Sequence, residues 1–472
     1  MLEGLEIKEV MFDKINSTEL VRLESEFYTA KSFDLINPFS GEEIIDLVQY
    51  GTSKELNEEN DGYPILRLNE FDSSFISKPS KYCDIIDEKT FQSLKLLKND
   101  VLICRTNGNF RYVGKSALVP KDYEYAYASY LFKIRPKNEM INSSTLVSFL
   151  NSKYGRIEIE KYSMASNQVN FSPAKFRQLR IPRFSEVLNK FIENLTYNSF
   201  ENLQNSKQCY SQAENLLLQE IGLKDFTPSK EPVNVKSFKD SFATSGRLDA
   251  EYYQLKYEQV VNKVKDKSYD TLQNLVDINK SIEPGSKNYA ESGLPFMRVA
   301  DLSKNGLSEP QKFISDSFIK ENRDKISDLK PKKGTILFSK DGSVGIAYHL
   351  RQNYNGITSG AILHLNIKDE KRILPEYLTL ALNSKVVQMQ AERDAGGSII
   401  LHWRVGEIEN VVVPIIDFDK QQQIANLIEE SFALKKQSEY LLEVAKKAVE
   451  IAIEENEEVA IAYINNQSNS NG

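Results

Sequence analysis

Residues that could carry out catalysis are sparse and scattered in this sequence. It contains neither the GxxxxGK[ST] phosphate loop nor a GxGxxG word after a strand. The few potential metal ligands and nucleophiles lack ligand spacing and CxxC pairs; they are His349, His364, His402, Cys83, Cys104 and Cys209. The word INPFSG at 36–41 lacks the second proline of the Asn-Pro-Pro-aromatic motif of adenine methyltransferases, and we interpret it as a loop. We therefore expect no catalytic residues and no metal site.

Polar loops are stronger candidates, and the chemistry that they offer is recognition of DNA bases. Arg and Lys suit the O6 and N7 atoms of guanine, and Asn and Gln suit N6 and N7 of adenine. In the first half of the chain, the words RTNGNFRYVGK (105–115) and SNQVNF (166–171) supply such side chains. The candidates are Arg105, Asn107, Asn109, Arg111, Lys115, Asn167, Gln168 and Asn170.

The second half offers polar loops at two corresponding places, SKDGSVG (339–345) with the residues that follow it, and GGSIILHWR (396–404). The candidates are Ser339, Lys340, Asp341, Ser343, Tyr348, His349, Arg351, Ser398, His402, Trp403 and Arg404. Any one of these side chains could equally be part of a solvated turn, since Asn and Gly favour turns without any ligand. The segments are firmer predictions than the residues, because both halves place polar loops at the same two points.

The charge distribution supports nucleic acid as the ligand. Between residues 95 and 180 there are fifteen Lys and Arg against six Asp and Glu, a local balance of +9, whereas the whole chain is −7. A local basic field attracts a phosphate backbone. The acidic average indicates weak DNA binding by the chain without partners.

The length and composition indicate a protein of several domains with real cores. The chain has 472 residues, of which 40% are hydrophobic and 10% aromatic. No signal peptide and no apolar run of bilayer length is present in the sequence. The sparse, odd number of cysteines is typical of a reducing compartment, so we expect a soluble, cytoplasmic protein.

The sequence contains an internal repeat. The word LNSK occurs at 150–153 and at 382–385, an offset of 232, and an apolar-Pro pair follows each copy at the same distance. Four further word pairs occur in the same order at offsets of 225 to 234: RLESEFY and RLDAEYY, YPILRLNEF and LPFMRVADL, DVLICRTNGN and GTILFSKDGS, and IENLTYNSF and IANLIEESF. We infer a duplication. In LNSK we expect Leu to pack in a core and Asn-Ser to form a turn or helix end, with no direct role in DNA binding.

Each half predicts strands first and a long helix afterwards, an α+β fold. Apolar runs that end in Asn-Gly or Asp-Gly predict hairpins over 106–119 and 340–350, with strands joined by a tight turn. After the shared proline, apolar and small residues alternate by three and four, which is a heptad seam. Small seam residues allow close approach, so the simplest packing pairs the two long helices antiparallel. The alternative is that each helix packs on its own domain.

The sequence resembles the DNA specificity subunit of type I restriction–modification systems. The repeated Arg-Leu-acid start, LPFMRVADL, GTILFSKDGSVG, ITSGAILHLNI and the run from LNSK through VVVPII to DKQQQIANLIEE carry the resemblance. It covers essentially the whole chain and is clearest from about 290 to 450. The first half matches less well, since ICRTNGN replaces the more usual turn.

The resemblance implies two target recognition domains, each binding one DNA half-site, held apart by paired coiled-coil spacer helices. The expected boundaries are 1–183 for the first recognition domain, 184–223 for the first spacer helix, 224–246 for a linker, 247–416 for the second domain, 417–458 for the second spacer helix and 459–472 for a frayed tail. The expected spacer and partner-binding positions are Ile192, Leu195, Ile424, Leu427, Leu434 and Leu441.

The resemblance also implies a non-catalytic subunit. Its expected partners are double-stranded DNA, two methyltransferase subunits and restriction–translocase subunits. S-adenosylmethionine, ATP and Mg would belong to those partners, so no cofactor is expected in this chain. The alternatives are a specificity subunit of a related phage-defence methyltransferase, a silent recombination cassette, an enzyme with an unrecognised site, and a purely structural coiled-coil adaptor.

Overall fold

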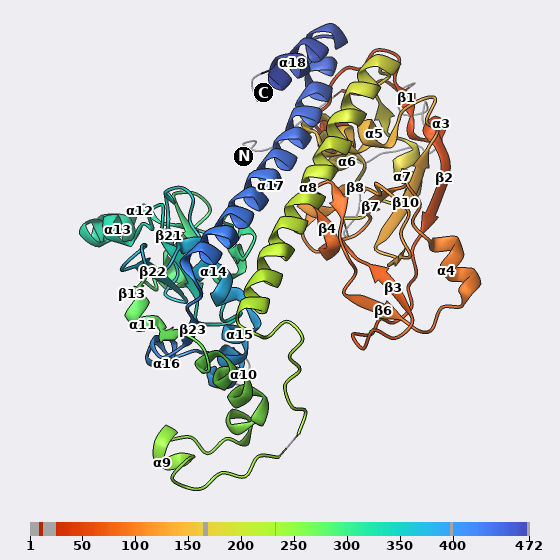
Figure 1. Cartoon of the computed structure of the whole chain (residues 1–472). Coiled ribbons are helices and arrows are strands. Elements are labelled where there is room, and N and C mark those ends of the chain that lie inside the picture. The colour runs from red at the N-terminus through yellow and green to blue at the C-terminus, as the bar shows by residue number, and fades with distance from the viewer. Residues whose placement is uncertain (1–8, 13–24, 164–168, 232, 397–399, 470–472) are drawn as a thin grey trace. The chain divides into compact units, whose positions relative to one another are not determined.

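The chain folds into two units that do not coincide with the two sequence repeats. In this computed structural model the described residues are 9–12, 25–163, 169–231, 233–396 and 400–469. Unit 1 combines residues 1–205 with 434–472, and unit 2 is residues 206–433 (Figure 1). Unit 1 therefore takes its last segment from the second repeat. Among the described residues, no helix is both long and apolar enough to cross a membrane.

The central sheet of unit 1 has six strands. Their order is β2 (Ile45–Tyr50), β10 (Leu131–Pro136), β7 (Val101–Cys104), β8 (Ser116–Leu118), β5 (Phe75–Ile76) and β4 (Phe71–Asp72). Smaller sheets are β6 (Lys81–Cys83), β3 (Tyr63–Leu66) and β9 (Ala126–Tyr127), and β1 (Phe39–Ser40) with β11 (Arg180–Ile181). The helices before the long one are α2 (Ser25–Thr29), α3 (Gly41–Ile44), α4 (Glu88–Leu94), α5 (Ser143–Asn151), α6 (Lys153–Ser163) and α7 (Pro173–Arg177).

Unit 2 repeats the core of this arrangement. Its main sheet has the order β13 (Val276–Lys280), β22 (Ile362–Ile367), β19 (Ile336–Ser339) and β20 (Ala347–His349), which corresponds to β2, β10, β7 and β8. The other sheets are β14 (Tyr289–Ala290), β18 (Phe313–Ile314), β15 (Leu294–Met297) and β21 (Ile357–Thr358); β12 (Tyr269–Thr271) with β23 (Val412–Pro414); and β16 (Leu302–Ser303) with β17 (Gly306–Leu307). The same strand order in both units is what a duplication predicts.

The helices of unit 2 also follow the repeat. They are α9 (Phe242–Ser245), α10 (Leu255–Lys265), α11 (Leu272–Leu275), α12 (Asp316–Glu321), α13 (Arg323–Leu329), α14 (Pro375–Asn383), α15 (Lys385–Asp394) and α16 (Val405–Glu409). Helices α14 and α15 meet at the second LNSK as α5 and α6 do at the first. In the predicted linker, the described residues form only α9 and otherwise lack regular structure.

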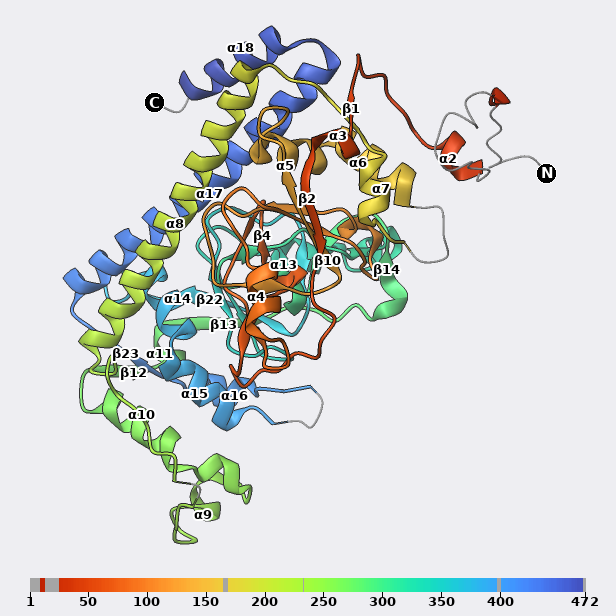
Figure 2. The same ribbon diagram turned by 90° about the vertical axis from the view of Figure 1, so that its right-hand side faces the viewer.

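Two long helices, α8 (Glu186–Glu220) and α17 (Phe418–Glu454), run side by side and antiparallel (Figures 1 and 2). Within unit 1, Ser199 Oγ lies 2.9 Å from Ser438 Oγ, and within unit 2, Ser206 Oγ lies 3.2 Å from Ser431 Oγ. The sequence repeat makes Ser199 equivalent to Ser431 and Ser206 equivalent to Ser438. The same pair of repeat positions therefore makes the seam contact in each unit, and the predicted antiparallel pairing is confirmed.

The seam residues that we assigned to spacing and partner binding pack inside the units. Ile192 and Leu195 are buried in the core of unit 1, and Ile424 is buried in that of unit 2. Leu427 packs against the core of unit 2 and Leu441 against that of unit 1, both partly buried. Leu434 is partly buried too. These side chains therefore face the protein interior.

Each LNSK joins a helix end to the sheet. Leu150 and Leu382 are fully buried. The Asn151 amide accepts from Ser116 N at 3.2 Å and donates to Ser116 O at 3.0 Å. Asn383 makes the same pair of hydrogen bonds to Ala347, at 3.0 and 2.8 Å. The serine that follows closes the helix through its hydroxyl, which donates to the carbonyl three residues earlier. The expected core and helix-end roles are confirmed.

Two local predictions are wrong. Strands β7 and β8, and β19 and β20, pair antiparallel as hairpins, but the connections 105–115 and 340–346 are loops and not tight turns. The tail expected to fray from 459 is instead helix α18 (Glu457–Asn469) through most of its length. Its Ala460 and Ile464 are buried in the core of unit 1, so tertiary packing outweighs the polar composition of this segment.

The serine seam can be tested by enlarging one residue. Ser199 is fully buried against α17, so Ser199→Leu has no room and should destabilise the chain by about 1–3 kcal/mol. The measurement is the urea midpoint of unfolding. Ser211→Leu, on the exposed face of α8, is the matched control and should change it little. Equal effects of both substitutions would contradict the close approach of the helices.

The buried His364 predicts a pH dependence of stability in unit 2. Burial lowers the pKa of His364 from 6.5 to about 4, and Thr358 Oγ1 lies 2.8 Å from its Nε2. Between these values the unfolded chain binds more protons than the folded chain. The contribution is therefore fully present above about pH 6.5 and is lost as the pH falls towards 4, by up to about 3 kcal/mol.

His364→Gln should flatten this dependence. The measurement is the free energy of unfolding at pH 7, 6 and 5. Identical slopes for the wild type and His364→Gln would refute a role for His364.

Candidate nucleic-acid interface

The two polar segments predicted in the first repeat are hydrogen-bonded to each other in unit 1. Phe171 N donates to Arg105 O at 2.8 Å, and Thr106 and Asn170 form an isolated antiparallel bridge. Arg105 N also donates to Tyr130 O at 2.8 Å. Three segments that are distant in sequence thus converge where β7 ends.

Unit 2 builds the same junction from its own two segments. Trp403 N donates to Lys340 O at 2.8 Å, and Asp341 and His402 form the antiparallel bridge. Lys340 N donates to Ala361 O at 2.8 Å. The backbone pattern of unit 1 recurs bond for bond, although the side chains at the junction differ. A constant frame with variable side chains is suited to recognising two different ligands.

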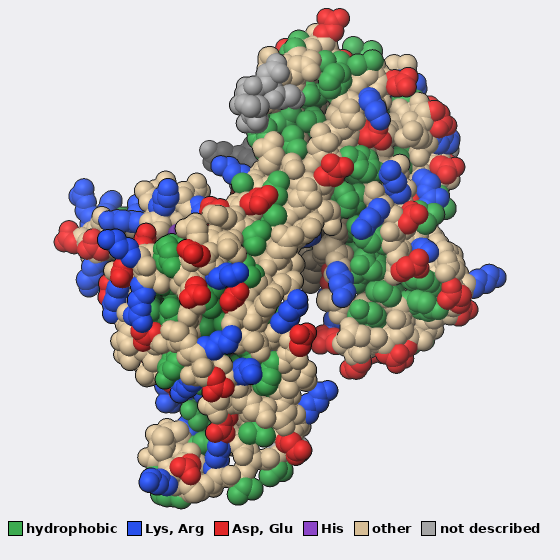
Figure 3. Space-filling view, in the orientation of Figure 1, with side chains coloured by type: hydrophobic (Ala, Val, Ile, Leu, Met, Phe, Trp, Pro, Cys, Tyr) green, Lys and Arg blue, Asp and Glu red, His purple; other side chains and the backbone are tan. Residues whose placement is uncertain are grey.

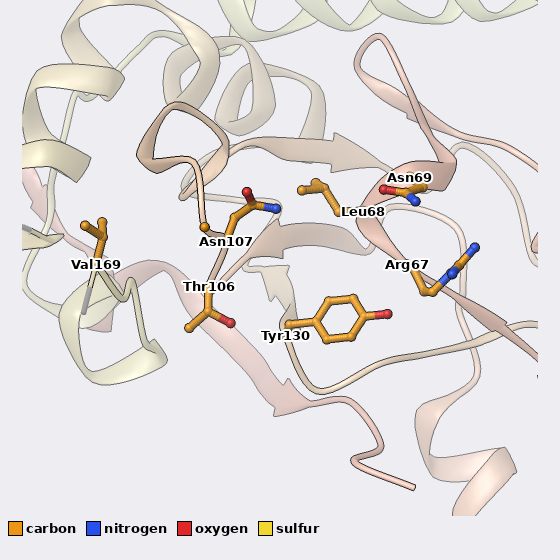
Figure 4. Close-up of a pocket in the computed structure, with 8 residues that line it drawn as sticks. Arg67, Leu68, Asn69, Thr106, Asn107, Tyr130 and Val169 are labelled. Atoms are coloured by element: carbon orange, nitrogen blue, oxygen red, sulfur yellow. The ribbon is translucent and has the colours of Figure 1, made fainter. Parts of the chain in front are cut away.

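The junction in unit 1 opens into a hollow of about 700 Å³. Figure 4 shows side chains from three places around it: Arg67, Leu68 and Asn69 after β3, Thr106 and Asn107 after β7, and Tyr130 before β10, with Val169 at one side. The Tyr130 ring points from the Thr106 side towards Arg67. The polar edges on this wall can form hydrogen bonds with a flat, polar ligand such as a base edge.

Buried polar atoms without a partner occur at Arg67, which lines this hollow, and at Arg105 and Asn170, which adjoin the lining residues Thr106 and Val169 in the sequence. Arg67 Nε, Arg105 Nε and Asn170 Oδ1 have no hydrogen-bond partner among the described residues. The Arg105 guanidinium lies 5.3 Å from the centroid of the Tyr50 ring. Since an unpaired buried donor or acceptor is costly, these atoms mark a place where a polar ligand would be stabilising. The equivalent arginine of unit 2, Arg298, also has an unpaired Nε.

Asn107 and Asn109 shape the loop 105–115 with their side chains. Asn107 Oδ1 accepts from Asn109 N at 2.8 Å, and Asn109 Oδ1 accepts from Arg111 N at 3.1 Å. A bidentate contact with adenine needs both the amide oxygen and the amide nitrogen. Their oxygens are engaged within the loop, so the exposed Arg111 is better placed for direct recognition. Lys115 is half-buried. Its pKa is lowered, because the effect of burial outweighs the opposite effect of the nearby Asp72 carboxylate.

In unit 2, six predicted residues lie at the loop pair. The ring of His402 lies 2.9 Å (Nδ1) from Asp341 Oδ1, and Lys340 pairs with the same aspartate. Ser343 and Arg404 are exposed. Ser339 is fully buried and holds the turn, since its hydroxyl donates to Ser343 O at 2.6 Å. The exposed groups and not Ser339 are available to a ligand.

Other predicted residues of unit 2 pack against the protein. Trp403 is buried, with its ring 5.7 Å from that of Phe338. Arg351 lies over the Phe432 ring at 3.5 Å and donates to Glu429 at 2.8 Å on helix α17. Tyr348 faces the same ring. These side chains join the second β-sheet to α17, and their placement favours a structural role.

His349 belongs to the same contact. Its Nδ1 lies 3.2 Å from Glu376 Oε1, and the interaction with His349 lowers the pKa of Glu376 against the effect of burial, which raises it. With Glu429 these residues form the one group in the described part of the chain whose ligand atoms lie within 4.8 Å of one another. The Arg351 cation already neutralises Glu429, so we assign the group to packing.

Three predicted residues, Asn167, Gln168 and Ser398, lie outside the described residues.

The structure also revises the charge argument. Many of the basic side chains between residues 95 and 180 are paired within unit 1: Lys95, Lys133, Arg135, Lys153, Arg177 and Arg180. The fully buried Asp100 carboxylate, for example, lies 2.7 Å from Arg135 and 3.7 Å from Lys133. Lys153 and Arg177 pair with Glu454 and Glu42, which lie outside this range, so the local excess of +9 overstates the field that a ligand would experience.

A basic surface of unit 2 was missed. Lys and Arg side chains gather over α12 and α13 (Figure 3). The segment 312–333 contains Lys312, Lys320, Arg323, Lys325, Lys330, Lys332 and Lys333 against four acidic residues, and all but Lys330 are exposed. Counting charge over 312–333 alone would have revealed it. Such a surface can contact phosphates.

Comparisons with known proteins agree on one family. Residues 265–443 match the profile of the type I restriction modification DNA specificity domain. The chain is 22% identical over 409 residues to the type I restriction enzyme EcoKI specificity subunit of Escherichia coli K12, covering 83% of this chain and 80% of that one. It is 28% identical over 145 residues to the StySPI specificity subunit of Salmonella potsdam, 29% of this chain and 30% of the other.

Among solved structures, the S subunit of a type I restriction-modification system from M. genitalium is similar at 14% identity, with a TM-score of 0.39. The match covers 88% of this chain and 96% of that chain.

The role of Asn109 in shaping the loop gives a test that needs no ligand. Asn109→Ala removes the acceptor for Arg111 N and should loosen the loop by about 0.5–2 kcal/mol. Hydrogen exchange at the amides of Arg111, Tyr112 and Val113 should then be faster. Asn109→Ser keeps a short side-chain acceptor and should stay close to the wild type. Unchanged exchange in Asn109→Ala would show that the loop is held by other contacts.

Proposed function

Because the chain belongs to the family of type I restriction–modification specificity subunits, we propose that it recognises a two-part DNA site, one half-site per unit. DNA sequence recognition is the function of this chain, and it is a non-catalytic subunit. The two-part site, the assignment of one half-site to each unit and the partners named below are the proposal.

One observation carries the proposal. The same junction of two polar loops recurs in both units with matching backbone hydrogen bonds, and its side chains differ between them. Asn107 and Arg111 occupy the loop in unit 1, whereas Lys340, Asp341 and Ser343 occupy it in unit 2. Two equivalent frames with different side chains would bind two different half-sites in the same manner.

We further propose that methyltransferase subunits dock on the outer faces of α8 and α17, and that restriction–translocase subunits join this assembly. The inner faces are occupied by the seam. S-adenosylmethionine, ATP and Mg would be bound by those partners. In this arrangement the chain recognises the DNA sequence, and the partner subunits carry out the chemical reactions.

The decisive experiment is a genome-wide map of methylated adenines in host cells with and without the gene. We expect a split motif to disappear with the gene. Asn107→Ala combined with Arg111→Ala should alter or abolish recognition of one half of the motif only, because both residues belong to the loop of unit 1. Lys239→Ala, an exposed residue outside both loops, is the control.

A map that does not change on deletion would contradict the proposal. A change in both halves of the motif after the unit 1 substitutions, with the control unchanged, would contradict the assignment of one half-site to each unit.

A further inference from the structure

Two aromatic side chains project from the candidate recognition loop of unit 1. Phe110 is 49% exposed and Tyr112 is 45% exposed, on either side of the exposed Arg111. Val113 of the same loop is buried, so the loop has its own anchor in the core and does not need these rings for packing. The exposed parts of both rings are therefore available to a ligand.

The backbone beneath these rings is fixed. Phe110–Tyr112 form a short 3₁₀ turn capped by Asn109. Val113 N donates to Phe110 O at 3.0 Å, and Arg156 Nη1 donates to Val113 O at 2.7 Å. Gly114 has a φ of +78° and closes the turn. Rings on a preorganised turn lose little conformational entropy when they bind.

Their surroundings favour nucleic acid over protein. Arg111 separates the two aromatic residues in the sequence, and Lys115 Nζ is 5.9 Å from the centroid of the Tyr112 ring. The patch consists of isolated rings among cations and amides, whereas a protein-docking site would need a broader apolar area. Rings interleaved with cations are typical of surfaces that stack on bases while contacting phosphates.

We propose that Phe110 and Tyr112 insert against the bases of the half-site recognised by unit 1 and partly unstack one base step there. This inference rests on the proposed function. The half-site is then selected in part by how easily that step opens, which favours flexible pyrimidine–purine steps. The matching loop of unit 2, residues 340–346, carries no aromatic side chain, so ring-driven unstacking is confined to one half of the DNA site.

The test uses the assembly isolated from host cells through a tag on this chain, with a duplex carrying both half-sites from the methylation map. A 2-aminopurine placed at successive positions reports loss of base stacking by a rise in fluorescence. We expect a rise within the unit 1 half-site on binding of the wild type. Phe110→Ala combined with Tyr112→Ala should abolish it and weaken binding by about tenfold or more.

Two controls separate stacking from general damage. Phe110→Leu combined with Tyr112→Phe keeps apolar bulk and should retain most of the rise. Phe238→Ala removes a ring that is 70% exposed outside the loop and should change neither readout. Because all these side chains are exposed, we expect the variants to have the same melting temperature as the wild type.

The outcomes distinguish the two proposals. Unchanged fluorescence and affinity in the double alanine variant would overturn the insertion while leaving the proposed function intact. Weaker binding with the fluorescence rise retained would also overturn it, since the rings would then contact the backbone only. An assembly that shows no preference for the mapped duplex would refute the proposed function itself.

Discussion

The close antiparallel contact of α8 and α17 is the constraint on which the rest of the structure depends. Serines at the seam let the two helices approach closely and share hydrogen bonds at Ser199 with Ser438 and Ser206 with Ser431. Each contact lies within one unit, and each joins helices from different repeats. Both cores are therefore built from two distant parts of the sequence: Ile192 meets Val444 and Ala445 in one cluster, and Ala213 meets Ile424 in the other.

A fixed core allows the loops to vary. The LNSK asparagines tie the helices to β8 and β20 by paired amide contacts that depend on backbone atoms of the strand. The loop junctions are likewise held by main-chain hydrogen bonds. Side chains at the loop tips can therefore change without disturbing the frame.

The duplication and the pair of long helices could be predicted from the sequence, because repeated words and heptad spacing are visible in it directly. The word LNSK located the same helix end in both halves, and small residues at heptad spacing indicated the antiparallel pair. Helix α18 was missed because its polar composition concealed Ala460 and Ile464, whose burial depends on a distant partner. The candidate site was predictable as segments but not as residues. No sequence pattern shows that Arg351 turns to α17, that Trp403 enters the core, or that Phe110 remains outside.

The composition of unit 1 has a consequence for biosynthesis. Unit 2 is one continuous stretch, residues 206–433, whereas unit 1 needs residues 434–472 to complete the core begun by residues 1–205. A ribosome therefore releases every residue of unit 2 before it releases the segment that closes unit 1. Until then the apolar faces around Ile192 and Leu203 lack Val444, Val449 and Ile464. The first domain to be translated is the last that can finish folding, and its apolar face stays exposed during that delay.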